Sequence, residues 1–144
     1  MDSILAKKVF PCYMQKIKLP LEAKEEELTV YRICKHGRVD AESFLSSYEE
    51  YAKQGRLADL DLQDVSSYSL SCWEKMKDAR RSLVFFTKKE PRAIAAIGIT
   101  SAKCGIVQRT RERKGKNAKS HIDWWLYQGG KPYEYFKEVE LSNE

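Results

Sequence analysis

The chain has 144 residues, of which 42% are hydrophobic, 33% are charged and 11% are aromatic. This length and apolar content are enough for one core, and the aromatic share excludes an intrinsically disordered chain. The formal net charge is +5, but residues 103–119 hold seven basic residues and one acidic residue. The rest of the chain is nearly neutral. We therefore expect a single domain over residues 1–144 with one basic segment.

The sequence disfavours a membrane-spanning protein and a disulfide-stabilised protein. No window holds the about 18 consecutive apolar residues of a membrane span, and residues 1–16 lack the apolar stretch of a signal peptide. The four cysteines lie 22, 38 and 32 residues apart, so no pair has the spacing of a zinc or redox motif. We expect a cytoplasmic protein with free, mostly buried thiols, no membrane partner and no indicated metal site.

The first half of the chain predicts an arm, a strand and a helix. Residues 1–26 form an N-terminal arm that includes an acidic stretch. Apolar and polar side chains alternate over residues 28–34, which predicts a strand with Arg32 on its apolar side. A helical apolar stripe then predicts a helix that begins after Asp40 and ends at Gly55.

The second half contains further regular elements. In order, they are an extended segment at 66–73, a helix that ends near residue 89, a buried strand at 93–100, a basic loop at 103–120, a strand at 121–127 and a closing element at 132–139. Strands interleaved with two main helices predict an α+β fold around one mixed β-sheet.

Arg32 is the first candidate site residue. Burying a guanidinium costs several kcal/mol unless oxygen atoms meet its charge, so an arginine on an apolar strand face requires a partner. Either it reaches solvent or pairs with a carboxylate of the fold, or it clamps a phosphate with its planar fork.

Serine hydroxyls form the second candidate. Ser67, Ser69 and Ser71 alternate and would share one face of an extended segment. Ser71 also begins an S-x-x-E pattern with Glu74, which is typical of the capping box that starts a helix. We expect Ser71 to be a helix cap, which leaves Ser69 as the candidate binding residue.

The strand at 121–127 contains the third group of candidate site residues. Alternation places His121, Asp123 and Trp125 on one face, while Ile122 and Trp124 face the core. A histidine and a carboxylate two residues apart can divide acid/base work, because imidazole titrates near neutral pH. The alternative is that Asp123 pairs with an arginine of the basic loop and His121 is structural.

The basic loop contains the fourth group of candidate site residues. It is rich in cations and lies directly before two tryptophans, a combination typical of contact with a phosphodiester backbone. An acidic protein surface would also fit, and so would a solvated loop without a partner. The candidate residues are Arg109, Arg111, Arg113, Lys114, Lys116 and Lys119.

The order of these features resembles the ADP-ribosyltransferase superfamily. The resemblance rests on Tyr31-Arg32 in the first strand, on Ser69-Leu70-Ser71 before the second helix and on a late acid. It implies that Arg32 holds the phosphates or ribose of NAD and that Ser69 braces the strand beside the nicotinamide. A late carboxylate would stabilise the oxocarbenium-like transition state. The usual Ser-Thr-Ser is Ser-Leu-Ser here, and no Glu-x-Glu or Gln-x-Glu precedes a late strand, so the candidate acids are Asp123, Glu134 and Glu138.

Two classes of function follow. The first is an NAD-dependent ADP-ribosyltransferase-like enzyme that modifies a polyanionic or protein acceptor. Its nucleotide site would contain Tyr31, Arg32, Ser69 and Trp125, and its catalytic residues would be His121 and Asp123. The second is a non-enzymatic module that binds nucleic acid or an acidic protein through the basic loop, such as an inhibitor or adaptor from a mobile element.

Overall fold

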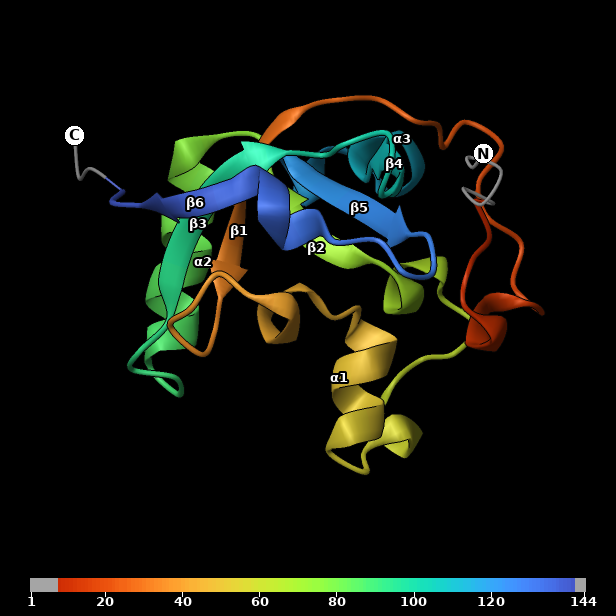
Figure 1. The fold of residues 1–144 in the computed structure, drawn as a ribbon, viewed down its shortest axis with the longest axis horizontal. Coiled ribbons are helices and arrows are strands. Elements are labelled where there is room, and N and C mark those ends of the chain that lie inside the picture. The colour runs from red at the N-terminus through yellow and green to blue at the C-terminus, as the bar shows by residue number, and fades with distance from the viewer. Residues whose placement is uncertain (1–7, 142–144) are drawn as a thin grey trace.

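The computed structural model describes residues 8–141, and their strands form one six-stranded sheet (Figure 1). The strands are β1 (Thr29–Cys34), β2 (Leu70–Trp73), β3 (Ile94–Ile99), β4 (Gly105–Arg109), β5 (His121–Leu126) and β6 (Phe136–Val139), in the order β4-β5-β2-β1-β3-β6. The helices are α1 (Ser47–Lys53), α2 (Met76–Thr87) and α3 (Arg111–Lys114). The α+β class is confirmed, and the sheet is antiparallel throughout where we expected a mixed one.

Alternation along β1 sorts its side chains between the two faces of the sheet. Val30 and Cys34 enter the main core, whereas Ile33 packs on the opposite face beside Leu83 and Phe86 of α2. Figure 1 shows α2 lying along β1 and β3. The predicted strand and its two faces are therefore confirmed. Among residues 8–141, no helix has both the length and the apolar character that a membrane crossing requires.

The predicted helix after Asp40 is interrupted at Leu45, which is extended with φ −88° and ψ 144°. A short 3₁₀ helix precedes this residue, and α1 follows it. The reason is a capping box: Ser46 Oγ accepts from the Glu49 amide at 3.1 Å, and Glu49 Oε1 accepts from the Ser46 amide at 2.9 Å. Gly55, at φ +68°, follows the end of α1 as predicted.

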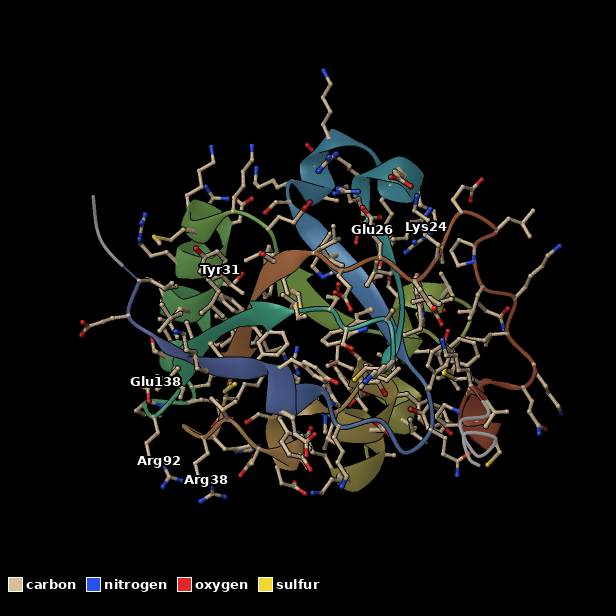
Figure 2. All side chains as sticks on the ribbon, turned by 45° about the horizontal axis from the view of Figure 1, so that its top comes forward. Lys24, Glu26, Tyr31, Arg38, Arg92 and Glu138 are labelled. Carbon is tan, nitrogen blue, oxygen red and sulfur yellow. The ribbon has the colours of Figure 1, made fainter. Side chains whose placement is uncertain are left out.

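The described part of the N-terminal arm, residues 8–26, lies against the rest of the fold. The arm's first seven residues fall outside the described part of the chain. Met14 is buried in a second core cluster with Tyr68 and Trp125. Further along, Lys24 pairs with Val107 of β4 through backbone hydrogen bonds in both directions, and Figure 2 shows this extended segment running beside β4.

The predicted basic loop contains regular structure that periodicity did not indicate. β4 pairs with β5 over Gly105–Arg109, and α3 follows it directly. All four cysteines are free thiols, and three of them, Cys34, Cys72 and Cys104, are buried. Burial raises the pKa of Cys72 to about 12, so this thiol stays protonated. The prediction of free, mostly buried thiols is confirmed.

Candidate functional site

A fully buried carboxylate lies at the centre of the site. Asp123 of β5 accepts hydrogen bonds from Ser69 Oγ at 2.6 Å, Thr110 Oγ1 at 2.8 Å and the Arg113 guanidinium at 2.8 Å. Ser66 Oγ donates a longer one at 3.2 Å. Burial by itself would raise the pKa of Asp123, but these hydrogen bonds lower it below its usual range. Asp123 is therefore an ionised group inside the protein.

His121 is joined to this carboxylate through Thr110. The Thr110 hydroxyl gives its one hydrogen to Asp123, so its contact with His121 Nδ1 at 2.6 Å must be an N–H donation from the imidazole. His121 Nε2 is then unprotonated and accepts from the Ser71 hydroxyl at 2.7 Å. Burial lowers the pKa of His121, against the opposing charge of Asp123, and keeps the imidazole neutral. The hydrogen bonds thus run in one direction from Ser71 to Asp123.

Replacing Thr110 with valine tests this direction. Valine keeps the shape of the side chain but removes the acceptor of the His121 Nδ1–H, so the proton should move to Nε2 and donate to Ser71 Oγ. Long-range ¹H–¹⁵N NMR will show the Nδ1–H tautomer of His121 in the wild type and the Nε2–H tautomer in Thr110→Val. Ser71→Ala is the control, because it should leave the Nδ1–H tautomer in place. A wild-type Nε2–H tautomer would contradict the assignment.

Ser71 and His121 line an open hollow of about 550 Å³ beside the first turns of α2. A second hollow of about 270 Å³ adjoins it and is lined by Arg32 and Ser69. The linings of the two hollows share Ser47, Ser71 and Trp73, so the hollows are adjacent. We call the two together the β2 groove, because β2 forms its floor.

Arg32 lies at the edge of the β2 groove and is 7% exposed. It donates to the backbone carbonyls of Ser43 at 3.0 Å, Ser71 at 2.9 Å and Leu45 at 3.4 Å. These bonds use three of the five guanidinium N–H groups. Within residues 8–141, no carboxylate forms an ion pair with it. Arg32 is therefore a buried cation without a counter-ion among the described residues. Two of the interpretations offered for it, a carboxylate partner and exposure to solvent, do not hold.

The predictions for Trp125 and Ser71 are wrong, and Tyr31 lies outside the β2 groove. Tyr31 points to the face of β1 opposite Arg32, toward α2, and does not line the β2 groove (Figure 2). Trp125 is fully buried and its Nε1 donates to the Val65 carbonyl at 3.0 Å, so it offers no surface to a nucleotide. Ser71 is not a cap, because it lies inside β2 and α2 begins only at Met76.

The serine segment also differs from the expected extended face. Val65–Tyr68 is a 3₁₀ helix, so Ser67 and Ser69 do not alternate along one strand. Ser67 instead donates to the Asp61 carbonyl at 2.6 Å. Ser69 meets Asp123 as described above.

Half of the predicted cationic residues are used within the fold. Arg109 bonds Glu74 at 3.0 and 3.2 Å, Arg113 bonds Asp123, and Lys114 bonds Asp64 at 2.9 Å. The other three are exposed and form no ion pair with a carboxylate of the described residues: Arg111, Lys116 and Lys119. The pairing of Asp123 with an arginine of the basic loop, one of our two interpretations, is confirmed.

Sequence patterns did not indicate Thr110 and Ser66. Thr110 follows β4, which was hidden in a segment predicted to be a loop, and Ser66 lies 57 residues from its carboxylate partner. No local periodicity could have identified either residue. Comparisons of this chain with protein-family models, curated proteins and solved structures found no match, so the site is interpreted from its own geometry.

Proposed function

We propose that the β2 groove binds a nucleotide of the NAD type and that the protein is an ADP-ribosyltransferase-like enzyme. The observation that carries this proposal is the buried charge of Arg32, which has no counter-ion and lies at the wall of the groove. An unpaired buried guanidinium is costly, and two of its N–H groups have no acceptor. A phosphate oxygen that entered the groove would supply both the negative charge and the acceptor.

The arrangement of strands supports the same proposal. Arg32, Ser69 and Asp123 lie on or beside β1, β2 and β5, which are adjacent in the sheet. Ser69 contacts Asp123 directly, and Arg32 holds the Ser71 carbonyl one residue beyond β2's start. The resemblance to ADP-ribosyltransferases implies that Arg32 and Ser69 lie beside the nucleotide, and both line the groove, whereas Asp123 lies beneath it. The free thiols also fit the cytoplasmic setting that we propose for the protein.

The residues would take distinct roles. In the transfer, the glycosidic bond of NAD would break, nicotinamide would leave, and the acceptor hydroxyl oxygen would form the new bond to the ribose carbon while losing its proton. Asp123 lies beneath the groove and does not line it, so its charge would act through Thr110 on His121. His121 Nε2 lines the groove with Ser71, and it would accept a proton from an acceptor hydroxyl directly or through the Ser71 hydroxyl. The ionised Asp123 would stabilise the imidazolium that results.

The test is thermal unfolding with and without NAD. A ligand of the native state raises stability by about 2.7 kcal/mol at a hundred times its dissociation constant. We expect NAD to raise the melting temperature of the wild type and to leave Arg32→Gln unchanged, because the neutral amide cannot replace the cation. Arg32→Lys keeps the charge and should retain part of the shift.

Arg38→Gln is the matched control, because Arg38 is an exposed arginine paired with Asp40 at the surface. It should behave like the wild type. If saturating NAD does not shift the melting temperature of the wild type, the proposed function is wrong.

A further inference from the structure

We infer that a cationic hollow beside the β2 groove binds the phosphodiester backbone of single-stranded nucleic acid. This hollow, which we call the cationic basin, has a volume of about 570 Å³ and lies between the start of α2 and the basic segment. Its cations come from two parts of the chain, with Lys75, Lys77 and Arg81 on the α2 side and Arg111, Lys116 and Lys119 on the other. The sequence did not indicate the contribution of α2.

Two carboxylates line the basin; a cation neutralises Glu74, while Asp78 is hydrogen-bonded through Oδ2 and has no hydrogen-bond partner at Oδ1. Glu74 bonds Arg109 at 3.0 Å, and Asp78 accepts from the Ser120 hydroxyl at 2.6 Å and from the Ser120 amide at 3.2 Å. The hydrogen bonds from Ser120 lower the pKa of Asp78 against the effect of burial, so Asp78 stays ionised. Only Arg81 approaches Asp78 among the unengaged cations, at 3.6 Å.

Five cations of the basin are therefore left without an ion-pair partner in the described chain: Lys75, Lys77, Arg111, Lys116 and Lys119. All five are exposed. Like charges that converge on a concave surface raise the local potential and attract polyanions. Such a basin is the electrostatic complement of several phosphates, not of one.

The backbone conformation of Lys119 gives a second, independent argument that the basin binds a ligand. It has φ +54° and ψ −129°, and it is the one non-glycine residue with positive φ among residues 8–141. A non-glycine residue held there costs on the order of 1–3 kcal/mol. The next residue, Ser120, is anchored to Asp78 and fixes the backbone at this point. Glycine would relieve the strain, so a lysine here is explained if its ammonium group contributes to binding.

The basin adjoins the β2 groove. Asp78, Arg81 and Lys119 line both hollows, so a chain bound in the basin would extend toward the hollow that His121 lines. Trp73 lines the groove next to His121, with ring centroids 5.5 Å apart and planes at 74°. Cations followed by a partly exposed aromatic ring match the recognition of single strands, in which phosphates are neutralised and bases stack.

Trp73 favours a single strand over an acidic protein as the occupant. This partly exposed ring can stack a nucleic-acid base beside the cations, whereas an acidic protein surface would use the cations alone. The role of this nucleic acid as the acceptor of ADP-ribose rests on the proposed function, whereas its binding to the basin does not.

The experiment is fluorescence anisotropy with labelled single-stranded DNA and RNA of about 20 nucleotides between about 50 and 200 mM NaCl. The basin variant is Arg111→Ala/Lys116→Ala/Lys119→Ala in the full chain. The matched control removes three exposed lysines elsewhere, Lys16→Ala/Lys18→Ala/Lys88→Ala. We expect the basin variant to weaken binding at least tenfold and to reduce the salt slope by about 2, since each single-strand phosphate contact contributes about 0.7. The control should change affinity less than about twofold.

Three results would overturn the inference. They are the absence of salt-dependent binding by the wild type, equal losses in the basin and control variants, and better competition by polyglutamate than by unlabelled oligonucleotide. Lys119→Gly is a second variant that should keep the fold, because glycine adopts this backbone conformation without strain. We expect it to raise the melting temperature and to weaken oligonucleotide binding. Unchanged affinity would count against the basin.

The outcome is separable from that of the proposed function. NAD binding is measured without oligonucleotide and depends on Arg32, which lies outside the basin. If NAD produces no thermal shift but the basin variant loses oligonucleotide binding, the proposed function fails and the basin stands. If NAD binds but the oligonucleotide does not, the inference about the basin fails and the proposed function stands.

Discussion

Asp123→Asn will lower the free energy of unfolding by about 3 kcal/mol at neutral pH, in the range expected when one partner of a buried ion pair is removed. The carboxylate is completely buried and accepts from Ser69, Thr110 and Arg113. An asparagine amide would present its own N–H donors to this set of donors and leave the Arg113 guanidinium without a counter-ion. Urea denaturation followed by circular dichroism measures the loss.

The matched control is Asp64→Asn. Asp64 also pairs with a cation of the basic segment, Lys114 at 2.9 Å, but its side chain is 33% exposed. Exposed pairs contribute about 0–1 kcal/mol, so this variant should remain close to the wild type. Equal destabilisation by the two substitutions would show that Asp123 is not an ionised structural centre.

Asp123→Asn will also change how the stability of the protein depends on pH under acidic conditions. The pKa of Asp123 is lower in the folded protein than in the unfolded chain, so its contribution is complete above the unfolded value of about 3.9. This contribution is lost as the pH falls through the folded pKa, because the unfolded state then binds the proton more readily. Asp123→Asn should therefore lose less stability than the wild type between about pH 4 and the acid end of the titration.

Gly105→Ala will destabilise the protein by about 3 kcal/mol, at the upper end of what overpacking costs. An added methyl group at this position would overlap the carbonyl oxygen of Trp125 and the backbone of Leu126. Both obstacles are main-chain atoms of β5, so no side-chain rotation can relieve the overlap. β4 must move away from β5, and Thr110 at its end will move away from Asp123. Urea denaturation and the ¹H–¹⁵N spectrum of His121 measure the two effects.

Gly130→Ala is the control for this substitution. A methyl group at Gly130 would meet its nearest neighbours at 3.4 Å or more, within ordinary contact. We expect its stability to stay within about 1 kcal/mol of the wild type and the His121 signals to be unchanged. Wild-type stability in Gly105→Ala would mean that the close approach of β4 to β5 is not required.

Local patterns were sufficient for the elements whose side chains repeat. The alternation in residues 28–34 and 121–127 corresponds to β1 and β5, and the apolar stripe before Pro91 corresponds to α2. The helix after Asp40 was overextended because its apolar stripe continues across Leu45, while the Ser46–Glu49 capping box starts α1 anew. β4 was missed because its strand character comes from pairing with β5 and with Lys24.

The site was predictable only in part. Arg32, Ser69, His121 and Asp123 were identified from residue type and strand face, and all four lie at or beneath the β2 groove. The pairing of Asp123 with an arginine of the basic loop was one of the two interpretations, but its contact with Ser69 was not predictable. Ser69 and Asp123 are 54 residues apart and meet only through the pairing of β2 with β5. Ser71 was assigned to a helix cap, since a capping pattern cannot show where a strand continues.

The sequence by itself determined that the positive charge is concentrated in residues 103–119 of an otherwise nearly neutral chain. Only the tertiary structure decided how that charge is used. Arg109, Arg113 and Lys114 are neutralised by carboxylates outside this segment, while Arg111, Lys116 and Lys119 join cations at the start of α2 around one basin. The physical reason is that electrostatic pairing depends on distance in space, and folding brings together groups that no sequence spacing relates.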